Sequence, residues 1–270
     1  MENKTLTPYF KNLPLAAAWE GDFGLLSMNG MPPGQLKLLM DICKNAPENT
    51  KAVYDFLIEK DPLFRDIYGD GTFVDQEEQF VFPFITGKRI PEDIKEVAGP
   101  IGTQTSKYHQ ETLQQHVELV ASYLVDNEVD KELATQLAVL HDVGKKYTSA
   151  TNSVGGICCY NHAEISAFIA GHWLRASLDE KSAKEIVAVI YAHMLPVTSW
   201  NVKKHWKTGE PVDYAQDFYG QLLRYCENDK VSADRIFSLI CRFAICDNGV
   251  TEFSPAILEY IAKGHALFCD

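Results

Sequence analysis

The sequence lacks any apolar run near the roughly 18 residues that a membrane-spanning helix needs, and its polar start, MENKTLTPYF, has no signal-peptide core. Basic residues are also few: 25 Lys and Arg stand against 37 Asp and Glu, for a net charge of -12. Affinity for long nucleic acid comes from clustered Lys and Arg, so this balance argues against a nucleic-acid coat protein. A small nucleotide or a nucleic-acid end in a local pocket stays compatible. We expect a cytoplasmic protein with no membrane partner.

A disulfide framework is also missing from the sequence. The seven cysteines are scattered, Cys158 and Cys159 are adjacent, and there is no C-x-x-C pair. An odd count without framework spacing is typical of free thiols in a reducing compartment. We therefore expect thiols rather than disulfides.

Strand-like alternation is nearly absent, whereas apolar residues recur at helical spacing through most of the chain. With 46% hydrophobic and 23% charged residues, the composition is that of an ordinary globular protein. The expected fold class is all-α, a bundle whose helices bury their apolar stripes against one another. In the carboxy-terminal part, the strongest helical stripes span residues 109–124, 163–174, 184–194 and 234–247.

Turn-forming residues are more frequent in the first part of the chain than in the rest. Residues 1–105 contain the turn signals NGMPPG (29–34), YGDGT (68–72) and GPIG (99–102) around two predicted helices, 34–46 and 50–60. This segment has no cluster of His, Asp and Glu that suggests chemistry. We expect it to be a mostly helical amino-terminal extension that packs on a core domain at 106–270.

In the core domain, ligand-type side chains occupy the buried stripes. Each of four predicted helices has an apolar stripe that contains or ends in a histidine or an acid. A carboxylate directly follows one of these histidines in the sequence, and one more histidine stands at the start of a stripe. These residues are His116, His141, Asp142, His162, His193 and Asp247. A buried unpaired carboxylate costs several kcal/mol, and a metal cation would compensate all these placements at once. Imidazole and carboxylate ligands suit Mn, Fe, Ni, Co or Zn, and Mg less well.

Each of these residues could also have a purely structural role that involves no metal. A lone histidine on an apolar face is more often a core residue bonded to a carbonyl, and we assign that role to His172. Asp247 alone could pair with Arg242, and Lys145 and Lys146 could be solvated cations near a helix end. The structural interpretation must be invoked separately for every stripe, whereas one metal site explains all of them. We therefore favour the metal site.

The order His116, His141-Asp142, Asp247 resembles the HD-domain superfamily of metal-dependent phosphohydrolases over roughly residues 106–250. The stretch LHDVGK (140–145) matches the commonest form of its central motif, and YNHAEISA (160–167) resembles its following helix. The resemblance implies that His116, His141, Asp142 and Asp247 hold a divalent metal. His162 and His193 match the extra histidines of members that bind a second ion, which Asp142 would bridge.

Within that superfamily, the sequence most resembles the HD modules of RNA end-processing proteins, which are linked to polynucleotide kinases or to tRNA nucleotidyltransferases. The chain has no G-x-x-x-x-G-K-[ST] loop, no nucleotidyltransferase head and no G-Y-P after the doublet, so we expect a stand-alone HD protein. The resemblance implies a phosphomonoesterase or phosphodiesterase that acts on a nucleotide or on a phosphorylated or cyclic-phosphate nucleic-acid end. The alternatives are a (d)NMP nucleotidase, a (d)NTP triphosphohydrolase, or a catalytically silent HD binding or regulatory module.

Two groups of cations are candidates for substrate contact. Lys145 follows the doublet by one turn and could reach a phosphate oxygen, which makes it a catalytic candidate beside Asp142. Lys203 and Lys204 lie in NVKKHWKTGE (201–210), where Trp200 could stack on a base. A solvated surface loop with its tryptophans packed inward explains that second segment equally well.

Overall fold

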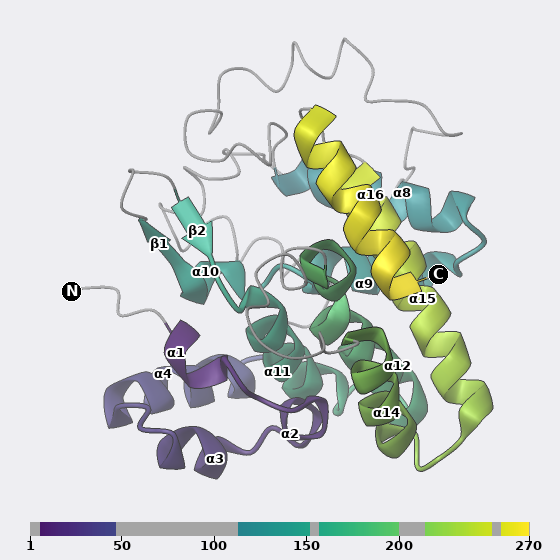
Figure 1. Ribbon diagram of the computed structural model, residues 1–270. Coiled ribbons are helices and arrows are strands. Elements are labelled where there is room, and N and C mark those ends of the chain that lie inside the picture. Colours follow the sequence, from purple (N-terminus) through teal and green to yellow (C-terminus); the bar gives the residue numbers. More distant parts are fainter. Residues whose placement is uncertain (1–5, 47–112, 152–156, 200–213, 250–254, 270) are drawn as a thin grey trace, which may run out of the picture.

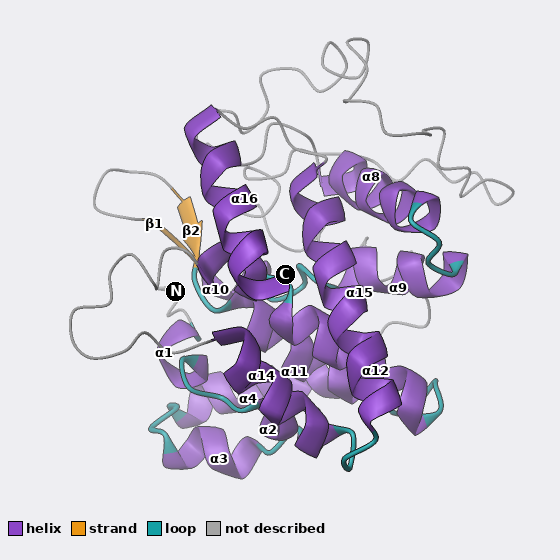
Figure 2. Ribbon diagram, turned by 45° about the vertical axis from the view of Figure 1, so that its right-hand side comes forward, coloured by secondary structure: helices purple, strands orange, loops and turns teal. Residues whose placement is uncertain are grey.

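A computed structural model describes residues 6–46, 113–151, 157–199, 214–249 and 255–269. These parts of the chain are almost entirely helical, which confirms the all-α prediction (Figures 1 and 2). A short antiparallel ribbon of two strands pairs Ser149 with Cys159 and Thr151 with Ile157. No helix in the described ranges is both long enough and apolar enough to span a membrane.

The helices and strands fall into three groups along the chain. The amino-terminal helices are α1 Thr7–Phe10, α2 Leu15–Glu20, α3 Phe23–Met28 and α4 Pro33–Lys44. The next elements are α8 Leu113–Asp126, α9 Lys131–Leu140, α10 Lys145–Thr148, β1 Ser149–Thr151, β2 Ile157–Cys159 and α11 His162–Leu174. The last are α12 Glu180–Ala192, α14 Tyr214–Tyr225, α15 Lys230–Gly249 and α16 Pro255–Cys269.

Helix α11 forms the centre of the bundle. It packs against α12, α2, α4, α10 and α9, and nearly all of its residues are buried, as expected of a helix that is apolar on every side. Figures 1 and 2 both show it surrounded by the other helices. Because α11 begins at His162, the helix that touches most of the core also carries a predicted ligand at its first residue.

Local signals fix where several helices begin. The Asp130 carboxylate accepts hydrogen bonds from the backbone N–H groups of Glu132 and Leu133 at the start of α9. Asp179 does the same for Ser182 at the start of α12. These carboxylates satisfy donors that have no partner within the helix, so the chain enters both ligand-bearing helices at a defined residue.

The described part of the amino-terminal segment, residues 6–46, packs on α11 and α12. Phe10 meets Phe168 edge to face at 5.7 Å between ring centroids, and the Trp173 indole N–H donates to the Ile42 carbonyl at 3.1 Å. The Tyr191 hydroxyl donates to the Leu13 carbonyl at 2.6 Å. The predicted helix at 34–46 is found as α4, whereas the one at 50–60 lies outside the described residues.

The expectation of free thiols is wrong at one pair. Cys241 on α15 and Cys269 at the end of α16 form a disulfide. Their separation of 28 residues follows no framework spacing, and the packing of α16 along α15 brings them together. The other cysteines of the described ranges remain thiols, of which Cys43 and Cys246 are buried.

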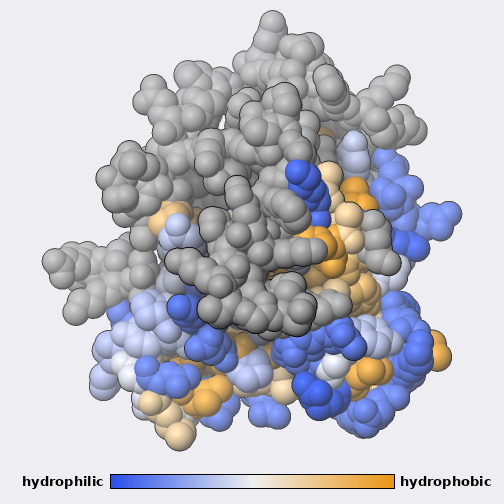
Figure 3. All heavy atoms as spheres, in the orientation of Figure 1, coloured by the Kyte–Doolittle hydropathy of each residue, from blue (hydrophilic) through white to orange (hydrophobic). Residues whose placement is uncertain are grey.

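Figure 3 shows one face of the molecule by hydropathy. Hydrophilic side chains cover most of its lower part, over the amino-terminal helices and α14, with scattered apolar atoms between them. Met28 and Leu38 are among the large apolar side chains exposed on the amino-terminal helices. Single exposed apolar residues of this kind are normal on a folded protein.

Candidate metal centre

The structure brings the six predicted ligands together in the interior, and it does so from five parts of the fold. One histidine is on α8, a histidine and an acid follow the end of α9, one histidine begins α11, one follows the end of α12, and one acid lies on α15. In chain order they are His116, His141, Asp142, His162, His193 and Asp247, and all are buried. The tertiary packing of several helices therefore builds one polar cluster within an apolar core.

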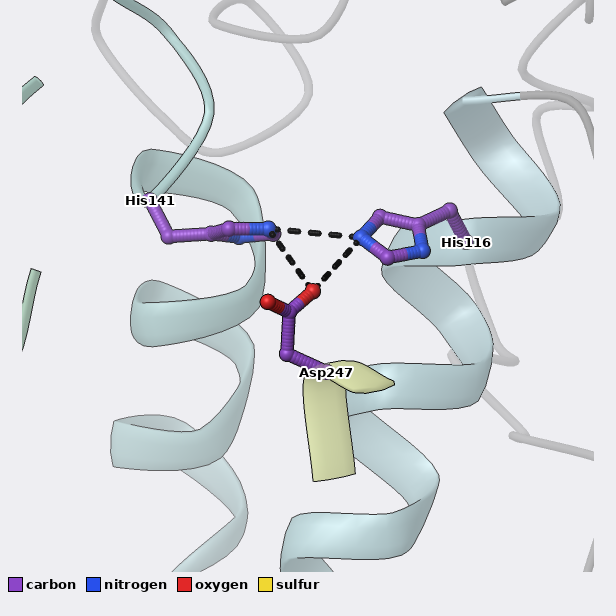
Figure 4. Close-up of side chains that lie close together, drawn as sticks. All are labelled: His116, His141 and Asp247. Atoms are coloured by element: carbon purple, nitrogen blue, oxygen red, sulfur yellow. Dashed lines mark hydrogen bonds and ion pairs between the residues drawn. The ribbon is translucent and has the colours of Figure 1, made fainter. Parts of the chain in front are cut away.

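A first triad consists of His116, His141 and Asp247 (Figure 4). The His116 Nε2 atom lies 3.1 Å from Asp247 Oδ1 and 3.3 Å from His141 Nε2. The distance from His141 Nε2 to Asp247 Oδ1 is 3.6 Å. Figure 4 shows the two imidazoles and the carboxylate, from three different helical segments, turned toward one point. These three side chains could hold a metal ion.

A second triad consists of Asp142, His162 and His193. The Nε2 atoms of His162 and His193 face each other at 3.2 Å, and His162 Nε2 lies 3.4 Å from Asp142 Oδ1. This group could hold a metal ion as well. The predicted ligands thus fall into two groups of three.

Asp142 belongs to the second triad and also faces the first. Its Oδ2 atom is 3.2 Å from His141 Nε2 of the first triad, whereas Oδ1 is turned to His162 of the second. Oδ1 is buried and has no hydrogen-bond donor within the described parts of the chain. A carboxylate with one oxygen toward each triad has the placement that a bridging ligand needs.

Backbone carbonyls fix how three of the imidazoles are protonated. The Nδ1 atoms of His141, His162 and His193 each lie 2.7 Å from a carbonyl oxygen, those of Ala138, Cys159 and Ile190 respectively. A carbonyl can only accept, so each Nδ1 carries a proton and each ring turns its Nε2 atom toward the cluster. Imidazoles that ligate metals are held in this way by outer hydrogen bonds.

The two facing lone pairs of His162 and His193 are a test of whether these residues suit a cation. Two acceptors 3.2 Å apart repel unless a proton or a metal ion lies between them. Burial and then the Lys145 charge lower the pKa of His162 to about 3. Burial and then His141 lower the pKa of His193 to about 4. A proton is therefore not retained at neutral pH, and the donor set fits a divalent cation.

The carboxylates of the cluster are ionised. Burial alone would raise the pKa of Asp142, but the charges of His141 and Lys145 outweigh it and hold that pKa well below its usual range. Burial acts on Asp247 in the same direction, and the hydrogen bond from His116 together with the charge of His141 lowers its pKa. Negative charge is therefore present in both triads, where a cation would be attracted.

Lys145 is buried beside the doublet, and its Nζ atom lies 2.6 Å from Asp142 Oδ2. Burial would lower the pKa of Lys145, but the Asp142 carboxylate raises it, so the ammonium is charged. The sequence suggested a phosphate contact for this lysine and did not indicate the ion pair. The other proposed substrate contacts, Trp200, Lys203 and Lys204, lie outside the described residues.

The structure also resolves the role of the remaining histidine of the apolar stripes. His172 Nε2 lies 3.2 Å from the Gly21 carbonyl oxygen, and its ring packs against Phe23 and Phe168. The predicted bond to a carbonyl is confirmed, and the side chain is half-buried rather than fully in the core. Arg242, the alternative partner of Asp247, instead donates to the Asn127 carbonyl at 3.1 Å.

Sequence reasoning missed an apolar wall of the cluster. The Phe243 ring, fully buried on α15, meets the rings of His141 and His193 at centroid distances of 5.2 and 5.9 Å. Phe243 precedes Asp247 by one helical turn, so helical phase places it on the same face, a signal present in the sequence. It restricts the rotation of two ligand rings by packing rather than by hydrogen bonds.

No protein-family model, curated protein or solved structure that we compared with this chain matches it. Membership of the HD-domain superfamily stays a prediction that rests on the LHDVGK motif and on the order of the histidines and acids around it.

Proposed function

We propose that the chain is a metal-dependent phosphohydrolase that acts on a nucleotide or on a phosphorylated or cyclic-phosphate nucleic-acid end. The observation that supports it is Asp142, a buried carboxylate with one oxygen toward each of two His/Asp triads. The side chains that would hold the first ion are His116, His141, Asp142 and Asp247, and those for the second are Asp142, His162 and His193. The imidazole-rich donor set favours Mn, Fe, Ni, Co or Zn over Mg.

Divalent ions at such a centre supply an activated water and neutralise charge on phosphoryl oxygens. The chain's own residues would orient these parts. Carbonyl-bonded His141, His162 and His193 keep their Nε2 atoms aimed at the reaction centre. Lys145, charged and buried beside Asp142, would place a point charge next to a nonbridging phosphate oxygen. The buried Phe243 ring would exclude bulk water from the side formed by α15.

Release of inorganic phosphate from a substrate panel tests the proposal. Chelator-treated protein is supplied with Mn, Ni or Co and incubated with mononucleotides, nucleoside triphosphates, 2′,3′-cyclic nucleotides and end-phosphorylated oligonucleotides. A strand-scission or ring-opening assay accompanies phosphate release, because opening a cyclic phosphate releases no inorganic phosphate. Activity toward free mononucleotides or triphosphates alone would indicate the nucleotidase or triphosphohydrolase alternatives.

Two variants separate chemistry from fold. Asp142→Asn removes the negative charge between the triads and is expected to abolish turnover. Asp234→Asn changes an exposed carboxylate that pairs with Lys230 and is the matched control, with activity expected to be unchanged. Protein that binds metal but hydrolyses nothing on the panel would support a catalytically silent module. Protein that binds no divalent ion would contradict the proposal.

A further inference from the structure

The turn that carries Asp142 and Lys145 lies directly on the first turn of α11. Gly144 is the point of contact: a Cβ atom there would be 2.3 Å from the His162 carbonyl oxygen and 2.7 Å from the Ser166 backbone nitrogen. Both of these atoms belong to helix backbone, which cannot yield as a flexible side chain can. Only glycine therefore allows this approach, which sets the Asp142 turn against the helix that begins with His162.

One buried hydroxyl fixes the turn in this position. The Gly144 backbone N–H donates to Ser166 Oγ at 2.8 Å, and the Ser166 side chain is fully buried. On the other side of the turn, Thr148 Oγ1 donates to the Gly144 carbonyl at 3.2 Å. Ser166 Oγ is thus an acceptor on α11 for a backbone N–H of this turn. It lies one helical turn after His162, on the same face of the helix.

We propose that Ser166 is a positioning residue that aligns Asp142 with His162 and His193, and so sets the affinity of the second metal ion. This inference rests on the proposed two-ion centre. Asp142 belongs to the turn that Ser166 holds, and its Oδ1 atom faces His162 at 3.4 Å. Loss of the hydroxyl would free the turn to move along α11, which changes this distance.

The first triad is held by other contacts. The His141 ring is fixed by the Ala138 carbonyl of its own helix, at 2.7 Å, and by the packed Phe243 ring. Asp247 and His116 come from α15 and α8 and bond each other at 3.1 Å. Asp142 would also contact the first ion, but the other three proposed ligands of that ion are held by these contacts. The proposal therefore predicts an asymmetric effect: removal of the Ser166 hydroxyl weakens the second ion more than the first.

Titration of Mn(II) into the chelator-treated full chain measures both affinities, by calorimetry and by the electron paramagnetic resonance signal of coupled ions. Ser166→Ala is expected to weaken the second binding step by roughly 10- to 100-fold, the usual effect of removing an outer hydrogen bond in a metal site. The first step should weaken by clearly less than the second, because three of its four proposed ligands are held by other contacts, and the coupled-ion signal should be lost at low Mn(II). Ser166→Thr, which keeps the acceptor oxygen, should restore it.

Ser177→Ala is the matched control, because Ser177 lies just after the same helix and its hydroxyl donates to the carbonyls of Trp173 and Leu174. Its two affinities should equal those of wild type. If Ser166→Ala is recovered unfolded, Ser166→Cys keeps nearly the same side-chain size with a weaker acceptor and is judged by the same two affinities. Thermal unfolding of each variant identifies those that are folded.

The outcomes separate this proposal from the proposed function. Wild-type protein that binds fewer than two ions contradicts the two-ion centre itself. Wild-type protein that binds two ions, with Ser166→Ala unchanged in both steps, overturns the role of Ser166 alone. Equal weakening of both steps overturns it too, since it indicates a general structural role. None of these readings depends on turnover.

Discussion

The stability of the metal-free protein should fall steeply between pH 7 and pH 5 because of two histidines. The pKa of His162 is lowered to about 3 and that of His193 to about 4, chiefly by burial. In the unfolded chain both rings titrate near pH 6.5. Below that pH the unfolded chain binds protons that the folded chain refuses, so the free energy of unfolding decreases as the pH falls.

The size of the effect follows from these values. Between pH 7 and pH 5, each ring that titrates at 6.5 when unfolded and below 5 when folded lowers the free energy of unfolding by about 1.9 kcal/mol. The two rings together give nearly 4 kcal/mol. Both side chains are almost fully buried, so solvent screening does not reduce the figure much. Such a loss is a large fraction of the 5–15 kcal/mol that a domain typically has.

Urea unfolding of chelator-treated protein at pH 7, 6 and 5 measures this. His193→Leu replaces the ring with an apolar side chain of similar size and should reduce the fall between pH 7 and pH 5 by about 1.9 kcal/mol. His265→Leu is the control, because its histidine lies outside the cluster, on α16 beside the Cys241 carbonyl. Equal pH dependence in wild type and His193→Leu would refute the view that His193 is buried and neutral.

Three further results are expected. His141→Ala and Asp142→Ala should each abolish turnover on whichever substrate the panel identifies, because both remove a proposed ligand of the first ion. His172→Ala should cost roughly 2 kcal/mol of unfolding free energy through the lost carbonyl bond and ring contacts, with metal stoichiometry unchanged in elemental analysis. Cys269→Ser should lower the free energy of unfolding by about 3.5 kcal/mol at most, the loop-closure value for the 28-residue separation of Cys241 and Cys269. Reductant should lower the free energy of unfolding of the wild-type protein by a similar amount and leave that of Cys269→Ser unchanged. A wild-type protein whose stability does not respond to reductant would contradict the disulfide.

The helices that carry the cluster could be predicted from the sequence because their signals are local. Apolar residues at helical spacing indicated α8, α11, α12 and α15, and the structure has a helix at each place. The ligand residues could be selected because a histidine or carboxylate on an apolar stripe conflicts with burial unless it has a partner. Both inferences need only residues within a few turns of one another.

The short amino-terminal helices and the strand ribbon could not be predicted in this way. Helices α1, α2 and α3 span four to six residues, too short to be stable alone, so their formation depends on packing against the rest of the chain. One such contact is the hydrogen bond from the Leu6 backbone N–H to the Tyr147 carbonyl at 3.2 Å. The disulfide could not be predicted from the sequence for the same reason, since it depends on where α16 packs.

Gly144 is required by the fold for a reason that its position in the sequence does not reveal. From the sequence alone, a glycine just after the apolar stripe of residues 133–141 would be assigned as a stop signal for that helix, the role of a glycine in left-handed backbone. In the structure α9 ends at Leu140, and Gly144 does not adopt a positive φ. The glycine is required instead for its missing side chain, since the turn touches the backbone of α11 at His162 and Ser166. Helical periodicity indicates which residues face inward. The register of one element on another depends instead on contacts such as that between Gly144 and Ser166, which are 22 residues apart. The alignment of Asp142 with the second triad is therefore a property of packing that the spacing of the ligands in the sequence does not contain.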